Sequence, residues 1–110
     1  MAESESIPQL ISSEREARVR NELGCIPEHC REGLLNYALY GVPPGSFLQA
    51  VLSNDLVEAC NRADHQNQRA LYDYVYVLYN AMPSAAWGSP EKVRAWIDAG
   101  IDLRRQEASR

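Results

Sequence analysis

The chain is poor in the residue types on which several classes of protein depend. Of its 110 residues only two are histidine, one is phenylalanine and one is lysine, Lys92. No uninterrupted apolar run approaches the roughly 18 residues of a membrane-spanning helix, which excludes a transmembrane segment. Gly-x-Ser-x-Gly, Walker A, dinucleotide-binding glycines and His-Glu-x-x-His are all missing, which excludes the enzyme classes that these motifs mark.

The remaining composition is that of one ordinary globular domain. Hydrophobic residues make up 45% and charged residues 24% of the chain, which fits neither a disordered tail nor a membrane protein. The length suits a single core. A net charge of −4 argues against a broad surface for nucleic acid or acidic membranes. The ten arginines to one lysine fit either high-GC codon usage, which we favour, or a need for guanidinium chemistry.

The cysteines and the N-terminal residues indicate a reducing compartment. The first six residues include two glutamates and no basic residue, unlike the basic start of a secretory signal, so we expect a cytoplasmic protein. The odd number of cysteines, Cys25, Cys30 and Cys60, argues against a disulfide framework. Their spacing with His29 and His65 matches no compact zinc finger, and Cys30 and Cys60 fall on apolar helical faces. We therefore expect buried thiols, surface histidines, no metal and no cofactor.

Hydrophobic periodicity and capping residues predict an all-α fold, a small single-domain bundle of five to six helices around a long tyrosine-rich central helix. We expect a flexible arm over residues 1–11, the helical domain over 12–100 and a polar tail over 101–110. The predicted helices cover residues 12–24, 27–40, 46–52, 56–63, 65–82 and 90–100, the last ending at Gly100. Two alternatives stay open: one helix kinked at Asn54 in place of two, and a strand over 71–79.

The tyrosines of the 65–82 helix are the main candidates for a binding surface. Tyr72, Tyr76 and Tyr79 recur at four and three residues, so their rings share one edge of the helix. Aromatic residues at helical spacing usually belong to the core. Together with Tyr74, however, these tyrosines point in more directions around the helix than burial of a single face requires. Tyrosine also favours interfaces, where one end of the ring stays wet. The predicted surface combines the three tyrosines with two helix starts, at Asn54 and Asp55 and at Trp87 and Ser89.

Short polar residues at helix starts allow two interpretations. Those that bracket the 56–63 helix are Asn54, Asp55, Asp64 and Asn67. They either cap helices, which we favour because every helix start leaves unsatisfied N–H groups, or hold a cation or ligand. The helix starts at residues 45–46 and 88–89 present small residues that suit a phosphate or another small anion.

Three blocks of the sequence carry a resemblance to known proteins. They are PGSFLQAVLSNDL from Pro44, YNAMP from Tyr79 and WGSPEKV from Trp87. Together they resemble short proteins of unassigned role found in phage and prophage genomes, over about residues 26–98. The resemblance implies no functional residue, because no activity is attached to that family. It implies a mobile-element context in a bacterial host, where small single-domain proteins commonly bind a host factor or a signalling molecule stoichiometrically.

The sequence contains none of the catalytic motifs named above and has a tyrosine-rich helix. These two features predict a non-catalytic binding protein. We expect a homo-oligomer, not an enzyme, that occupies a host protein and inhibits a host defence system. One alternative is a protein that sequesters a nucleotide, with its phosphate on a helix start and its base on a tyrosine or tryptophan. Another is a DNA- or RNA-associated regulator acting through Arg15, Arg18 and Arg20, although glutamates on the same helix weaken it.

Overall fold

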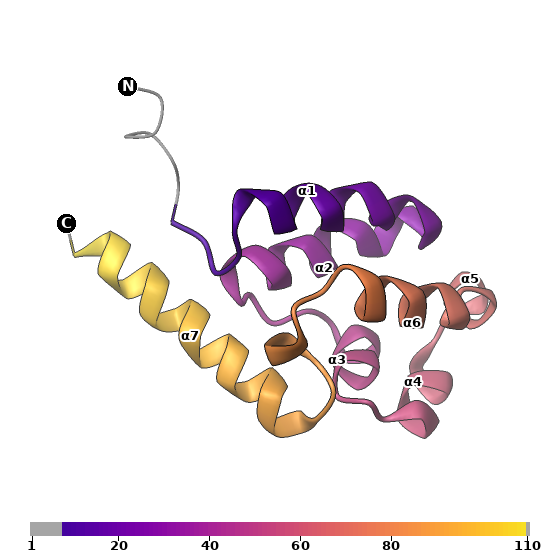
Figure 1. The fold of residues 1–110 in the computed structure, drawn as a ribbon. Helices are drawn as coiled ribbons and strands as arrows, with labels where there is room; N and C mark the ends of the chain where they lie inside the picture. Colours follow the sequence, from indigo (N-terminus) through magenta and orange to yellow (C-terminus); the bar gives the residue numbers. More distant parts are fainter. Residues whose placement is uncertain (1–7, 110) are drawn as a thin grey trace.

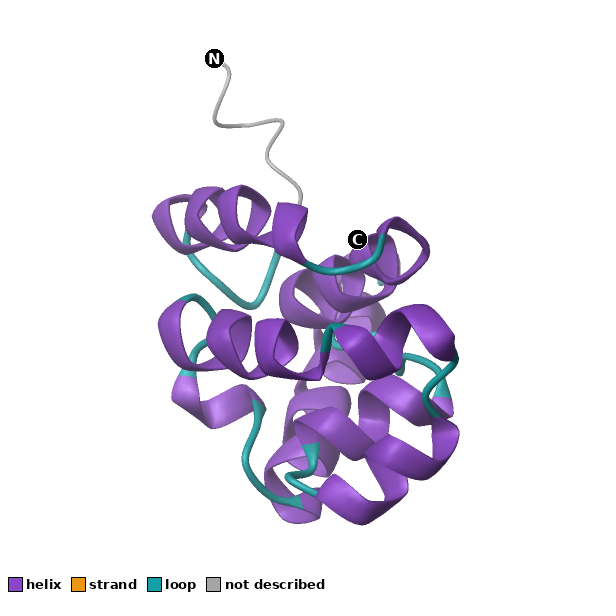
Figure 2. Cartoon of the chain, turned by 90° about the vertical axis from the view of Figure 1, so that its right-hand side faces the viewer, coloured by secondary structure: helices purple, strands orange, loops and turns teal. Residues whose placement is uncertain are grey.

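The computed structural model describes residues 8–109, and every regular element within them is a helix (Figures 1 and 2). The elements are α1 Ser13–Glu22, η2 Leu23–Cys25, α2 Glu28–Tyr40, α3 Ser46–Leu52, α4 Leu56–Arg62, α5 His65–Arg69, α6 Leu71–Asn80, η3 Ser84–Ala86 and α7 Pro90–Ala108. The predicted all-α fold is confirmed. Seven α-helices are present in this part of the chain because the predicted 65–82 helix is divided in two.

Four helices begin where a short polar side chain accepts a hydrogen bond from a first-turn N–H group. These capping residues are Ser12, Asp55, Asp64 and Ser89. Each bond satisfies one of the N–H groups that a helix start leaves free. The cap at Asp55 also confirms that the chain breaks between α3 and α4 and does not continue as one kinked helix.

Tyr37 of α2 connects three elements of the fold. The Tyr37 side chain is fully buried and its hydroxyl donates to the Ala86 carbonyl at 2.6 Å. The Tyr37 carbonyl accepts from Trp96 Nε1 at 2.8 Å. Burial raises the pKa of the Tyr37 phenol well above its ordinary value, so it remains a neutral donor. One residue thus ties α2 to both η3 and α7.

The tyrosine-rich helix is shorter and less enclosed than the sequence predicts. The chain turns at Ala70, with φ −101° and ψ 8°, and its N–H bonds the Asn67 carbonyl. Residues 65–69 are all polar, so hydrophobic periodicity cannot distinguish a short separate helix from an extension of α6. Only Tyr74, Val77 and Leu78 of α6 are buried, and its outer side faces solvent. This helix is therefore not apolar and enclosed on nearly all sides, as the sequence predicts, but half exposed.

The last helix is longer than predicted because Gly100 packs instead of ending it. Figure 1 shows α7 as one continuous rod, which runs to Ala108 through most of the predicted polar tail. Gly100 is buried where α7 meets the end of α2, and an added Cβ would collide with the Tyr40 carbonyl and with Gly41 Cα. Gly41, at φ 67°, ends α2 in the left-handed conformation that glycine favours.

The predicted N-terminal arm is partly tied to the domain. Residues 1–7 lie outside the described part of the chain. Beyond them, the Leu10 N–H donates to the Leu39 carbonyl at 2.7 Å, and Ile11 is buried. Residues 8–11 therefore pack at the end of α2, which corrects the prediction of a flexible arm for that stretch.

The glycine contact generates a stability prediction. Alanine normally favours a helix interior over glycine by about 1 kcal/mol. Because the new methyl would strike backbone, we expect Gly100→Ala to destabilise the fold by about 2 kcal/mol instead. Urea denaturation followed by circular dichroism measures the change. Ala99→Gly at the neighbouring exposed position is the control and should cost only about 1 kcal/mol. A Gly100→Ala variant as stable as the natural chain would contradict the contact.

Candidate functional site

The outer side of α6 is a continuous uncharged stripe. Its four members, the α6 stripe, are Tyr72, Val75, Tyr76 and Tyr79. Tyr72 is 76% exposed, Tyr79 78% and Val75 57%. The helical repeat produces this arrangement, because positions separated by three, four and seven residues lie on one side of a helix. The predicted edge of tyrosines is thus present, and it lies on the surface, not in the core.

A cavity of about 130 Å³ adjoins the α6 stripe, between α3, α4 and α6. Val75 belongs to both the stripe and the cavity wall, and Leu56 of α4, 69% exposed, forms the wall opposite α6. The lining is mainly apolar and comprises Ala50, Val51, Asn54, Asp55, Leu56, Ala59, Leu71, Val75, Leu78 and Trp87. A cavity of this size and character accommodates one bulky apolar group.

The corner between α3 and α4 holds one wall of the cavity in place. Asn54 has a left-handed φ of 65°, which asparagine tolerates better than most residues. The Asp55 carboxylate accepts from the Glu58 N–H at 3.1 Å, and the Asp55 N–H donates to the Ala50 carbonyl at 2.9 Å. Asn54 and Asp55 therefore act as turn and cap, and their position at the cavity follows from that role.

Trp87 closes another part of the cavity wall, held by backbone contacts. The neighbouring Gly88 N–H donates to the Leu52 carbonyl at 2.7 Å, which fixes the loop against α3. The Trp87 ring is half-buried, and its indole nitrogen is buried with no hydrogen-bond partner among the described residues. Ser89 does not line the cavity. Its hydroxyl caps α7 through Lys92 N, and Lys92 Nζ donates to the Ser84 carbonyl.

The structure therefore places the seven predicted site residues in three groups. Tyr72, Tyr76 and Tyr79 lie on the α6 stripe, while Asn54, Asp55 and Trp87 line the adjoining cavity. Ser89 lies apart from the cavity as a helix cap. The sequence did not mark the other seven lining residues as site residues; they are Ala50, Val51, Leu56, Ala59, Leu71, Val75 and Leu78. Each is apolar, but only the packing of α4 and α6 against α3 shows that it borders an opening.

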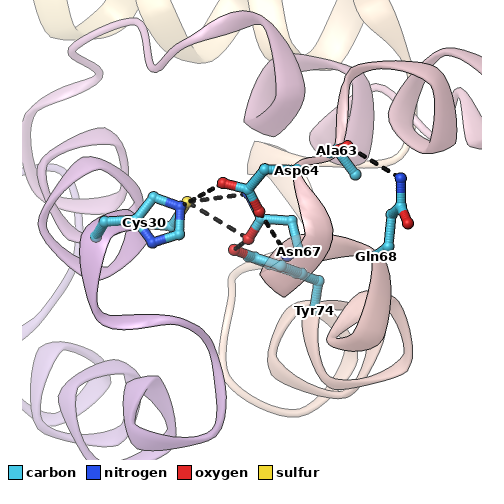
Figure 3. Close-up of polar contacts among 7 residues, drawn as sticks. Cys30, Ala63, Asp64, Asn67, Gln68 and Tyr74 are labelled. Atoms are coloured by element: carbon cyan, nitrogen blue, oxygen red, sulfur yellow. Dashed lines mark hydrogen bonds and ion pairs between the residues drawn. The ribbon is translucent and has the colours of Figure 1, made fainter.

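A polar cluster lies between α2, which carries Cys30, and α5, which carries Asn67 (Figure 3). Asn67 is buried, and its side-chain oxygen accepts from the Tyr74 hydroxyl at 2.5 Å. The Cys30 thiol lies 3.6–3.7 Å from the same amide group, within hydrogen-bond range for sulfur. Burial raises the pKa of Tyr74 well above its ordinary value, so the phenol stays protonated and donates. The sequence suggested a cap or ligand role for Asn67. In the structure its side-chain amide is instead the hydrogen-bond partner of the Tyr74 hydroxyl and the Cys30 thiol.

The two flanking groups of this cluster are on the surface. His29 Nε2 lies 2.9 Å from the Asp64 carboxylate, and both side chains are about half exposed. The hydrogen bond from the Asn67 N–H lowers the pKa of Asp64, with His29 as a smaller cause. No hydrogen bond joins the His29 ring to the Cys30 thiol within residues 8–109. The cluster thus lacks the nucleophile–base contact that covalent catalysis requires.

The cysteines and histidines bear out only part of what the sequence predicted. All three cysteines are free, but Cys25 and Cys60 are exposed and Cys30 is half-buried, so the prediction of buried thiols was wrong for Cys25 and Cys60. Cys60 lies on the exposed side of the short helix α4 (Leu56–Arg62), whose buried residue is Ala59. Both histidines are exposed, as predicted. No group of three metal-ligating side chains is present over residues 8–109.

The arginines of α1 are partly engaged within the domain. Arg15 Nη1 donates to the Ala81 carbonyl at 3.0 Å, and Arg20 pairs with Glu16 at 2.8 Å. Both contacts reduce the donors that are free for phosphates. In the described part of the chain, no helix combines the length and apolar character needed to cross a bilayer.

Comparison with protein-family models, with curated proteins and with solved structures finds no match to this chain.

The two tryptophans provide a matched test of the cavity wall. Phenylalanine at either position keeps an aromatic ring but removes the indole N–H. Trp96→Phe loses the hydrogen bond to the Tyr37 carbonyl, whereas Trp87→Phe removes a donor that is already unpaired. We expect Trp96→Phe to cost about 1–2 kcal/mol more in the free energy of unfolding, measured in urea. Equal costs would contradict the difference in hydrogen bonding.

The lowered pKa of Asp64 predicts a pH dependence. Because the folded state lowers this pKa from its ordinary value of 3.8, Asp64 stabilises the fold above that pH. The contribution is lost as the pH falls through the lower folded-state value. The gap in urea midpoint between the natural chain and Asp64→Ala should therefore be constant near neutrality and narrow below pH 3.8. When His29 is first replaced by glutamine, most of the difference in urea midpoint should persist, because the hydrogen bond from the Asn67 N–H is the main cause of the lowered pKa of Asp64. A difference in urea midpoint that does not change with pH would contradict the prediction.

Proposed function

We propose that this protein acts by binding another protein through the α6 stripe and the adjoining cavity, without catalysing a reaction. The α6 stripe is the observation that carries the proposal. An aromatic, uncharged stripe costs solubility in a monomer, and tyrosine is among the residues enriched at protein interfaces. The cavity beside Val75 provides what a flat stripe lacks, a recess for one anchoring side chain of the partner.

The context of this binding follows from the resemblance to short phage and prophage proteins. On that basis we propose that the partner is a host protein in the bacterial cytoplasm and that occupying it inhibits a host defence system. Two features support the proposal. The three cysteines are free thiols, which suits a reducing compartment, and no described cluster joins a nucleophile to a base.

Binding energy should be concentrated in few residues. Large aromatic side chains near the centre of an interface dominate its affinity, and their surroundings mainly exclude water. Tyr79 and Tyr72 present the most ring surface, and Val75 connects them to the cavity. Asp55 at the rim favours a basic residue beside the partner's anchor.

Site-specific photo-crosslinking in bacterial cells tests the proposal. Benzoylphenylalanine replaces Tyr72 or Tyr79 in the full chain, and exposed positions on other helices, Ala17 and Ala95, are the controls. We expect discrete adducts with another protein from the two stripe positions only, because only the stripe is held against a partner. Equal adducts from the controls, or none from the stripe, would overturn the proposal. The mass of each adduct separates a foreign partner from a second 12.4 kDa chain.

A further inference from the structure

The four positions of the α6 stripe are spaced symmetrically about its middle, and both outer positions are tyrosine. Tyr72 and Tyr79 lie at equal separations from the point between Val75 and Tyr76, where the middle of the stripe falls. On a helix the two outer rings are about 10 Å apart along the axis. A symmetric two-fold contact requires a surface to be complementary to itself, and a stripe of this order meets that requirement when two copies lie antiparallel.

We propose that α6 pairs antiparallel with α6 of a second copy, so that Tyr72 of one chain lies opposite Tyr79 of the other. The inference rests on the proposed function of the α6 stripe as a binding surface and names one occupant for it. The rings then meet as two equivalent aromatic pairs, in the edge-to-face or offset geometry that such pairs prefer. Val75 of each chain then lies opposite Tyr76 of the other, one such pair on either side of the two-fold axis.

Charge favours this face for self-pairing. The chain carries a net charge of −4, so two copies repel each other over most of their surfaces. The α6 stripe itself carries no charged residue, and Asp73, the one acid on α6, lies on a different, half-buried side. Contact through the stripe therefore brings no like charges directly together.

The exposed area is sufficient for a weak dimer. From the exposures of its four residues and of Leu56, the surface amounts to on the order of 600 Å² per copy. Stable interfaces bury about 800 Å² on each partner, and weak, transient ones about 600 Å² or less. A dimer in the micromolar range follows, weak enough for a tighter-binding host protein to displace the second copy.

Sedimentation equilibrium of the purified full chain, from about 1 μM to 1 mM, is the first test. We expect the mean mass to rise from 12.4 kDa toward twice that value with concentration. A chain that stays monomeric throughout would overturn the proposal. If that monomer still crosslinks a host protein from Tyr72 and Tyr79, the proposed function survives and only self-pairing fails.

Charge reversal tests the antiparallel register. Tyr72→Arg combined with Tyr79→Arg places like charges opposite each other in both aromatic pairs, and should raise the dissociation constant at least about 30-fold. Tyr72→Arg combined with Tyr79→Asp places opposite charges together only when the helices are antiparallel, and should dimerise more tightly than the first variant although less tightly than the natural chain. The proposal would be overturned if the first variant dimerised as strongly as the natural chain. It would also be overturned if the second variant dimerised as weakly as the first.

Two controls keep the comparison interpretable. Both substituted side chains are exposed, so folding should be preserved, and circular dichroism of each double variant checks this. Ala95→Arg places the same charge on an exposed site of α7, away from the α6 stripe, and should leave the dissociation constant unchanged. A loss of dimer in Ala95→Arg equal to that of the first variant would show that added charge alone prevents association, and would overturn the assignment to α6.

Discussion

The arrangement of the helices depends above all on the hydrogen bonds around Tyr37. Its hydroxyl holds η3, and its carbonyl holds Trp96 of α7, while the ring itself fills the middle of the core. In a buried setting an unpaired hydroxyl or indole N–H is costly, so each bond selects one position for the segment that it holds. Through η3 the same residue sets the loop that carries Trp87, and with it one wall of the cavity.

The proposed binding surface is the outward face of a helix whose inward face is well anchored. Tyr74 packs edge-to-face on Phe47, with ring centroids 5.2 Å apart, and its hydroxyl bonds the buried Asn67 amide. These contacts hold α6 firmly, so the stripe on its other side is presented rigidly. A rigid aromatic surface loses little conformational entropy on association, which makes binding through it economical.

Stripe and cavity also suggest how a single surface can serve two partners in turn. The stripe is symmetric and weakly apolar over its length, whereas the cavity lies to one side of it, toward α4. In the proposed dimer a second copy would use the symmetric spacing of the stripe, and the proposed foreign partner would also place an anchoring side chain in the cavity. Because both would occupy the same rings, binding of one would exclude the other.

Much of the secondary structure was determined by the sequence alone, because its signals are local. Capping by Ser12, Asp64 and Ser89 and the glycine end of α2 depend on bonds within a few residues, so they are visible in the chain itself. The spacing of the tyrosines likewise predicted one shared edge. The sequence could not show whether that edge lay in the core or in solvent, since the same repeat suits both.

Tertiary structure decided the points at which distant segments meet. Gly100 has the same local character as a helix-ending glycine, and only the backbone of α2 against it explains why α7 continues. The buried Asn67 amide and the cavity beside Leu56 likewise depend on residues more than ten positions away. Local propensity acts over one or two turns of helix, whereas burial and close packing are set by which helices come together. The sequence therefore determined the helices and their caps, and the packing determined which faces remain available for binding.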